Sequence, residues 1–305
     1  MLSEVFYWLF NMSLVASITG IVVLLIRLIR IIPRRVITVI WAIPFLRMWI
    51  PVGIGGKYSL MTIISKFTTK TVTVYEGEII PAFTFTNEVM AADSYFPITY
   101  KVNFVGDVFR VSSVIWIVIA LAIIMTFVFI YSMTMKEIKG SEHFRDNVFV
   151  SNSLTSPSVY GVFRPKIVIP KTMIENDYLQ YVLLHEQKHV SRLDNLWRII
   201  GFASAAVHWF NPLSWIFLKC FITDLEIACD ESVLQKCCLK EQKEYALALV
   251  SFAECRTIFI SAFGGAKIRT RIERILSFRK MTAASAIVFA VLIAAISYFL
   301  LTNAS

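Results

Sequence analysis

The sequence has little charge and few cysteines for its length. Charged residues make up 17% of the 305 residues, whereas 57% are hydrophobic and the mean hydropathy is +0.68. Soluble domains carry about 25% charged and about 45–50% apolar residues, so this composition excludes an ordinary soluble protein and a disordered chain. The five cysteines form no C-x-x-C pair, which argues against a disulfide-stapled domain and a cysteine zinc knuckle. The composition therefore predicts a membrane protein with room for one modest soluble domain.

Long uncharged runs locate the expected membrane spans. The runs at 5–26, 111–135 and 281–305 contain no charged residue and exceed the roughly 20 residues that a helix needs to cross a bilayer. A fourth run, at 36–56, is interrupted by Arg47 and by prolines, which membrane helices tolerate. We predict a mostly α multi-pass membrane protein with four transmembrane helices. The expected divisions are 1–56 for helices 1 and 2 with a basic loop, 57–110 for an extracellular loop, 111–135 for helix 3, 136–280 for a cytoplasmic domain, and 281–305 for helix 4.

Basic residues decide the expected orientation, because Lys and Arg favour the cytoplasmic side of short loops. The net charge is +9, and the loop at 27–35 holds four arginines, whereas residues 53–110 carry as many acidic as basic side chains. We therefore expect the large domain in the cytoplasm and both termini outside. The start of the chain lacks the basic region of a cleavable signal peptide, so the first span should stay as an anchor. Alternating β-branched and aromatic residues at 68–78 and 83–89 predict external β-structure.

The chemistry begins in the segment YVLLHEQKHVSRLDN, at residues 181–195. Apolar positions recur there at helical spacing, with no proline or glycine, so we predict a helix. His185 and His189 are four residues apart and therefore lie on one face, where both imidazoles can reach one ion. Glu186 follows the first histidine, as in H-E-x-x-H sites, where the carboxylate acts as general base. The pattern predicts a catalytic zinc site.

A catalytic zinc normally takes three protein ligands, so a third residue is needed. His208, a cysteine or a downstream carboxylate could supply it. Residues 221–236 are expected to form a second helix, on which Glu226 and Asp230 share a face. We predict Glu226 as the ligand, with Asp230 hydrogen-bonded to the outer nitrogen of a ligand histidine. Glu231 is the main competitor of Glu226.

The segment between these helices is uncharged at 199–218 and long enough to cross a membrane. A full crossing would place the histidines and Glu226 on opposite sides of the bilayer. The Asn211-Pro212 pair at its centre predicts a break, and hence a hairpin that is buried or dips into the membrane face. Upstream, residues 164–170 have the composition of a short strand, expected either at a sheet edge beside the zinc helix, where it could bind an extended peptide, or as a plain structural strand.

Four motifs together resemble a known family. They are P-x-x-x-G-x-x-x-P-x-I-x-x-P, HEQKHVSRLD, HWFNP and D-x-E-x-A-C-D-E. This set is similar to the membrane-embedded zinc metallopeptidase domain of the beta-lactam-sensing signal transducers, which control bacterial penicillinase and methicillin-resistance genes. The resemblance implies a gluzincin-like α+β domain in a bacterial cell membrane, with His185, His189 and Glu226 as Zn²⁺ ligands, Glu186 as general base and Asp230 in support. It also implies that an external signal activates a peptidase, which cleaves itself and promotes loss of a winged-helix repressor.

The chain departs from that family after the last span. The receptors continue into an external penicillin-binding sensor domain, whereas this sequence stops at Ser305. The only S-x-x-K of interest, at 277–280, has no S-D-N or K-T-G partner and is interpreted as a chance match. A signal is therefore expected through the loop at 53–110, through a separate sensor protein or through the membrane.

The basic segment at 267–280 has two readings. It should anchor the domain on anionic membrane lipid, and it could also hold a self-cleavage site near Ser277 and Phe278. Direct nucleic-acid binding is not expected, because the positive charge concentrates at membrane edges, and a homodimer is a further option.

Three functional hypotheses follow. The first is a regulatory zinc endopeptidase, the second a housekeeping membrane protease for quality control or processing, and the third a receptor or scaffold with a structural zinc.

Overall fold

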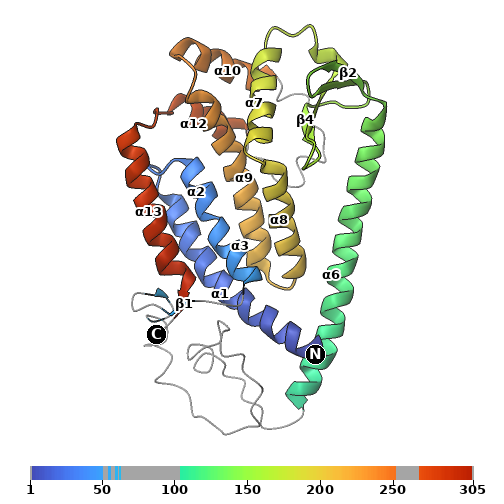
Figure 1. Cartoon of the computed structure of the whole chain (residues 1–305), viewed down its shortest axis with the longest axis vertical. Coiled ribbons are helices and arrows are strands. Elements are labelled where there is room, and N and C mark those ends of the chain that lie inside the picture. Colours follow the sequence, from blue (N-terminus) through green and yellow to red (C-terminus); the bar gives the residue numbers. More distant parts are fainter. Residues whose placement is uncertain are drawn as a thin grey trace.

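The computed structural model describes residues 2–50, 54–55, 59–60, 62, 104–251 and 268–303. Most of the expected extracellular loop, with its two β-rich segments, lies outside the described residues. In Figure 1 a group of long helices forms one half of the molecule, and a small sheet with shorter helices forms the other. Both chain ends lie in the half opposite the sheet.

Within the described residues, three helices are long and apolar enough to cross a membrane: α1 (Leu2–Leu28), α6 (Phe104–Glu137) and α13 (Ala283–Leu301). They coincide with the first, third and fourth expected spans, and each is a continuous helix. In Figure 1, α6 and α13 run along opposite sides of the molecule. Only 17% of the most apolar stretch of α6 and 6% of that of α13 is buried inside the protein. These two helices therefore present apolar side chains outward, as lipid contact requires.

The second expected span is divided into two short helices, α2 (Arg34–Ile40) and α3 (Ala42–Trp49). Pro44 explains the division, because its ring clashes with the carbonyl four residues earlier, at Ile40, and it has no N–H to donate. Neither helix alone is long enough to cross a bilayer. Arg47 on α3 is buried and donates from Nε and Nη2 to the carbonyl of Leu300, at 3.1 and 2.9 Å, so it caps the end of α13.

The expected break between residues 199 and 218 is confirmed. Helix α8 (Asp194–Val207) and helix α9 (Pro212–Leu234) form a hairpin. Asn211 causes the turn, because its Oδ1 accepts from the backbone N–H of Leu213 at 3.0 Å and caps α9. Its Nδ2 donates to the hydroxyls of Ser13 and Ser17 on α1, at 2.8 and 2.7 Å. The tip of the hairpin is thus anchored among the long helices.

A four-stranded sheet lies at the other end. Its spatial order is β2 (Glu142–Arg145), β3 (Val148–Ser151), β5 (Lys166–Pro170) and β4 (Ser158–Tyr160). β5 runs parallel to β3 and antiparallel to β4, with Ile167 paired with Val148 and Val159. Of the two alternatives for 164–170, the edge strand is therefore wrong and the plain structural strand is confirmed. The apolar run of β5 is buried between two neighbours, as is usual for inner strands, and β4 forms the edge.

The remaining helices in the described part of the chain are α7 (Leu179–Ser191), α10 (Leu239–Ser251) and α12 (Ile268–Leu276). Short 3-10 turns lie at Ile138–Gly140 and Lys171–Met173, and a two-residue bridge pairs β1 (Ile54–Gly55) with β6 (Thr302–Asn303). Helix α9 belongs to two hydrophobic cores. Phe217, Phe221 and Leu225 pack with α1, α2 and α3, whereas Val233 and Leu234 pack with α7, α10 and α12. One helix therefore joins the membrane part to the domain.

Candidate metal centre

Two histidines on α7 point their ring nitrogens at each other. His185 and His189 are buried, and their Nε2 atoms lie 3.1 Å apart. Two nitrogens that bind one zinc at about 2.0–2.1 Å in tetrahedral geometry would be separated by about 3.3 Å. The observed spacing is therefore close to that of two ligands of one ion.

Each histidine is held by its outer nitrogen. His189 Nδ1 lies 2.6 Å from Asp194 Oδ2, and His185 Nδ1 lies 2.8 Å from the hydroxyl of Tyr245. Tyr245 in turn donates to Asp230 Oδ1 at 2.6 Å, so His185 must donate its Nδ1 proton to the phenol oxygen. Asp194 accepts a hydrogen bond from His189 Nδ1 in the same way. Both Nε2 lone pairs are then directed inward, where only a cation can lie between them.

The chain reverses sharply to bring Asp194 back to His189. Leu193, between α7 and α8, has φ 55° and ψ 36°, a left-handed conformation that costs a non-glycine residue roughly 1–2 kcal/mol. Asp194 is the first residue of α8 and is 1% exposed. Arg192 Nε lies 3.3 Å from its Oδ1 and completes its environment. Backbone strain is thus located where it orients a histidine.

Helix α9 faces these histidines with Glu226. Its Oε1 lies 3.7 Å from His189 Nε2, and its Oε2 lies 3.9 Å from His185 Nε2. Two arginines approach the same carboxylate: Arg198 Nη2 at 2.5 Å and Arg271 Nη1 at 3.8 Å. Glu226 is therefore placed beside both imidazoles and is already balanced by positive charge.

Asp230, one turn further along α9, is bound by Arg271 from α12. Nε and Nη2 of the arginine donate to the two carboxylate oxygens, each at 2.7 Å. Arg271 Nη2 also lies 3.4 Å from His185 Nε2. Asp230 Oδ1 is 3.4 Å from His185 Nδ1, so Asp230 supports this histidine both directly and through Tyr245. A residue of the basic segment at 267–280 is thus part of the buried centre.

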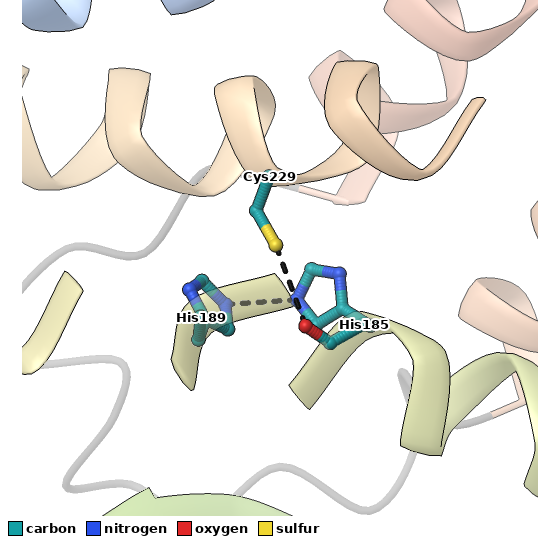
Figure 2. A group of neighbouring side chains, drawn as sticks. All are labelled: His185, His189 and Cys229. Carbon is teal, nitrogen blue, oxygen red and sulfur yellow. Dashed lines mark hydrogen bonds between the residues drawn. The ribbon is translucent and has the colours of Figure 1, made fainter. Parts of the chain in front are cut away.

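The third α9 side chain at the centre is Cys229. Donor atoms of His185, His189 and Cys229 all lie within 4.8 Å of one another. Figure 2 shows the sulfur directed from its helix toward the two imidazoles on α7. The thiol contacts the carbonyl oxygen of His185 at 3.5 Å.

The charges of the centre shift its pKa values. Burial disfavours the charged form of His189, but the charges of Cys229 and Glu226 and the hydrogen bond to Asp194 outweigh burial and raise its pKa to about 9. Burial would raise the pKa of Glu226, yet His189 and the neighbouring cations hold it well below the usual value. A metal ion that binds these imidazoles would therefore compete with protons.

Glu186 is buried directly after His185 on α7. Within the described part of the chain, its carboxylate makes no hydrogen bond or ion pair. Burial, together with the charges of Glu137 and Glu186, raises the pKa of Tyr160 on strand β4.

His208 and Glu231, two alternatives to Glu226 as third ligand, lie away from the centre. His208 lies at the hairpin tip, where its Nε2 contacts the carbonyl oxygen of Met48 at 3.1 Å. It follows Asp194 by 14 residues, about 20 Å along α8. Glu231 faces α2, where its oxygens accept from the backbone N–H groups of Arg34 and Arg35 at 2.9 and 3.1 Å.

Sequence reasoning missed four residues of the centre: Asp194, Arg198, Tyr245 and Arg271. Asp194 could have been found, because it lies within the quoted motif five residues after His189. Tyr245 and Arg271 come from α10 and α12, far along the chain, and only tertiary packing brings them to Asp230. Neither of the two interpretations of the basic segment, as a lipid anchor or as a self-cleavage site, accounts for buried Arg271.

The donor set fits a metal ion. It provides two imidazoles whose Nδ1 atoms are held by hydrogen bonds, a carboxylate from a second helix and a nearby thiol. Imidazole, carboxylate and thiolate are the ligand types of zinc. The two inward Nε2 atoms, 3.1 Å apart, face each other.

Comparison with known proteins agrees with this chemistry. The sequence model of the family described as "BlaR1 peptidase M56" matches residues 7–275. The chain is 32% identical over 173 residues to the regulatory protein BlaR1 of Bacillus licheniformis, which covers 52% of this chain and 29% of that protein. It is 32% identical over 88 residues to the methicillin resistance mecR1 protein of Staphylococcus aureus, covering 28% and 15%. The chain thus spans less than a third of the length of these relatives.

Proposed function

The chain belongs to the BlaR1 peptidase M56 family, a family of metallopeptidases, and from this we propose that it is a membrane-embedded zinc endopeptidase that acts in transmembrane signalling. Its substrates would be the chain itself, a winged-helix repressor of antibiotic-resistance-type genes, or both. The observation that carries the proposal is the pair of inward Nε2 atoms on α7 with Glu226 beside them on α9.

We assign His185, His189 and Glu226 as the metal ligands. Zinc in such a site activates water and polarises the carbonyl group of a peptide. Asp194 and Asp230 keep the outer nitrogens of the histidines protonated and oriented, so that the inner nitrogens stay available. Replacing either carboxylate would loosen a ligand without removing it.

Glu186 is the proposed general base. Its carboxylate is buried next to the first histidine and makes no ion pair among the described residues, so it can accept a proton from the attacking water. It would then pass this proton to the amine that leaves as the peptide bond breaks. General acid–base catalysis of this kind contributes about 10²–10⁴-fold to the rate.

Self-cleavage near Ser277 and Phe278 is supported by the position of α12. Arg271 on this helix reaches Asp230, and Ser277 follows it by six residues, about 9 Å along a helix. Ser277 is exposed, whereas Phe278 packs against the core of α7, α9, α10 and α12. The segment would have to leave this core to become a substrate.

The proposed orientation keeps the sheet and α7 in the cytoplasm and both termini outside. It is supported by the basic residues that surround the domain end of the long helices and by the location of both termini at the opposite end (Figure 1). Three spans follow from helix length, while α2 and α3 together would complete the fourth.

The decisive experiment compares the wild-type chain with Glu186→Gln in membranes, with a winged-helix repressor co-expressed. We expect both proteins to bind zinc and only the wild type to cleave itself or the repressor. Glu142→Gln is the matched control, because Glu142 is exposed on β2, and it should behave as wild type. Equal cleavage by Glu186→Gln and wild type would overturn the proposal and leave a structural zinc.

A further inference from the structure

The thiol of Cys229 is an unused donor in the proposed metal centre. Cys229 is 0% exposed and lies between the ligand Glu226 and the supporting Asp230 on α9. Residues three and four apart share a helix face, so all three side chains meet α7. Its donor atom lies within 4.8 Å of those of both histidines.

A purely structural role does not account for this position well. The thiol makes a weak contact to the carbonyl of His185 at 3.5 Å, and it also interacts with the side chains of both His185 and His189. Cys237, by comparison, is also buried and makes a similar contact, to Val233 at 3.4 Å, but belongs to an apolar cluster. A buried thiol beside two imidazoles is instead a zinc-binding environment, since thiolate is among the strongest zinc ligands in proteins.

We propose that Cys229 is a fourth protein ligand of the metal, which closes the coordination of the resting centre. The inference rests on the proposed function, because it assumes that His185, His189 and Glu226 hold the metal. Four protein ligands are typical of closed, structural zinc sites, whereas hydrolysis needs an open position. The thiol therefore has to dissociate from the metal before the peptidase can act. Until it does, the peptidase is inactive.

The position of Cys229 suits a ligand that can leave the metal. Glu226 is bound to Arg198 at 2.5 Å and approached by Arg271, so its carboxylate is shared between cations. The neighbours of the thiol are instead the two imidazoles, which would be its co-ligands. It is also on the helix that joins the membrane part to the domain, so that a displacement of α9 would change the distance from sulfur to metal.

X-ray absorption at the zinc edge tests the assignment on the full chain in detergent. The wild type should show one sulfur at about 2.3 Å in addition to nitrogen and oxygen at about 2.0–2.1 Å. The sulfur should be lost in Cys229→Ser and kept in Cys237→Ser. Bound zinc with only nitrogen and oxygen in the wild type would overturn the inference and leave the proposed function intact, whereas a wild type that binds no zinc would remove both. The wild-type spectrum decides even if the variant does not fold.

The rate of self-cleavage without any inducing signal tests whether Cys229 keeps the resting peptidase inactive. If about one molecule in ten is open at rest, Cys229→Ser should raise basal self-cleavage about tenfold. The comparison uses preparations whose zinc content and unfolding temperature match the wild type. Basal cleavage at or below the wild-type level in such a preparation would contradict the closing role.

Discussion

Two clusters of buried carboxylates lie on opposite faces of α9, and only one of them has the character of a metal site. Glu226 and Asp230 face α7, which presents His185 and His189 to them. On the other face Asp224 accepts from Arg27 Nε at 2.7 Å and from the indole N–H of Trp41 at 3.0 Å. Both clusters contain buried carboxylates, but different groups balance their negative charge.

The difference lies in what completes each cluster. Asp224 meets arginines and an indole, all fixed donors of the chain, so its charge is balanced without an exchangeable ion. Around Glu226 the facing groups include imidazole nitrogens that can lose a proton. A buried acidic cluster therefore indicates a metal site only when the groups opposite it are acceptors as well as donors.

Of the changes that test this difference between the two clusters, removal of a histidine should have the largest effect, on zinc binding. His189→Ala removes one of the two imidazoles among the proposed ligands, so zinc should fall from about one per chain to a small fraction of that. Cleavage should be lost with it, while the Asp224 cluster stays intact. Zinc content by elemental analysis measures the effect. His143→Ala, which changes an exposed histidine on β2, is the control, and retention of stoichiometric zinc by His189→Ala would exclude this residue as a ligand.

Asp224→Asn should show the second-largest effect, on stability instead of metal binding. The change leaves the cationic side chains of Arg27 and Arg34, which are 23% and 10% exposed, without their counter-charge. Breaking a buried pair in this way costs about 3 kcal/mol or more. Thermal unfolding in detergent should show the loss.

The matched control for that measurement is Asp107→Asn. Asp107 pairs with Arg110 at 2.8 Å on α6, but both side chains are largely exposed, so the change should cost less than about 1 kcal/mol. Equal loss of stability in the two variants would mean that the α9 cluster does not hold the membrane part to the domain.

Sequence reasoning could separate these two faces only in part. Spacing places Asp224 and Glu231 on one side of a helix and Glu226 and Asp230 on the other, but it does not say which side meets α7. The break at Asn211-Pro212 was predictable, because capping and proline act locally. The division at Trp41 was less so, because a proline inside an apolar run is compatible with either a bend or an end. Contacts from Tyr245 and Arg271 depend on long-range packing, which no local pattern contains.

A smaller effect is expected when the support of a histidine is weakened. Asp194→Asn keeps the size of the side chain but removes the charge that orients His189, and supporting partners of this kind are worth about 10–100-fold in metal affinity. Zinc competition with a chelator measures the change. Asp177→Asn, at an exposed position before α7, should leave the affinity unchanged. An affinity equal to wild type in Asp194→Asn would mean that the strained turn at Leu193 orients His189 unaided.

The smallest expected effect distinguishes the two glutamates of α9. Glu231 accepts from two backbone N–H groups at the start of α2, where a negative charge is worth about 1 kcal/mol, so Glu231→Gln should lower stability by roughly that amount and leave zinc unchanged. Glu226→Gln, the same substitution on the opposite face, should instead lower zinc binding. Zinc content and thermal unfolding of both variants separate the two roles. Loss of zinc in Glu231→Gln with retention in Glu226→Gln would reverse the assignment of the two faces, and α7 would then have to approach α9 from the side now covered by α2.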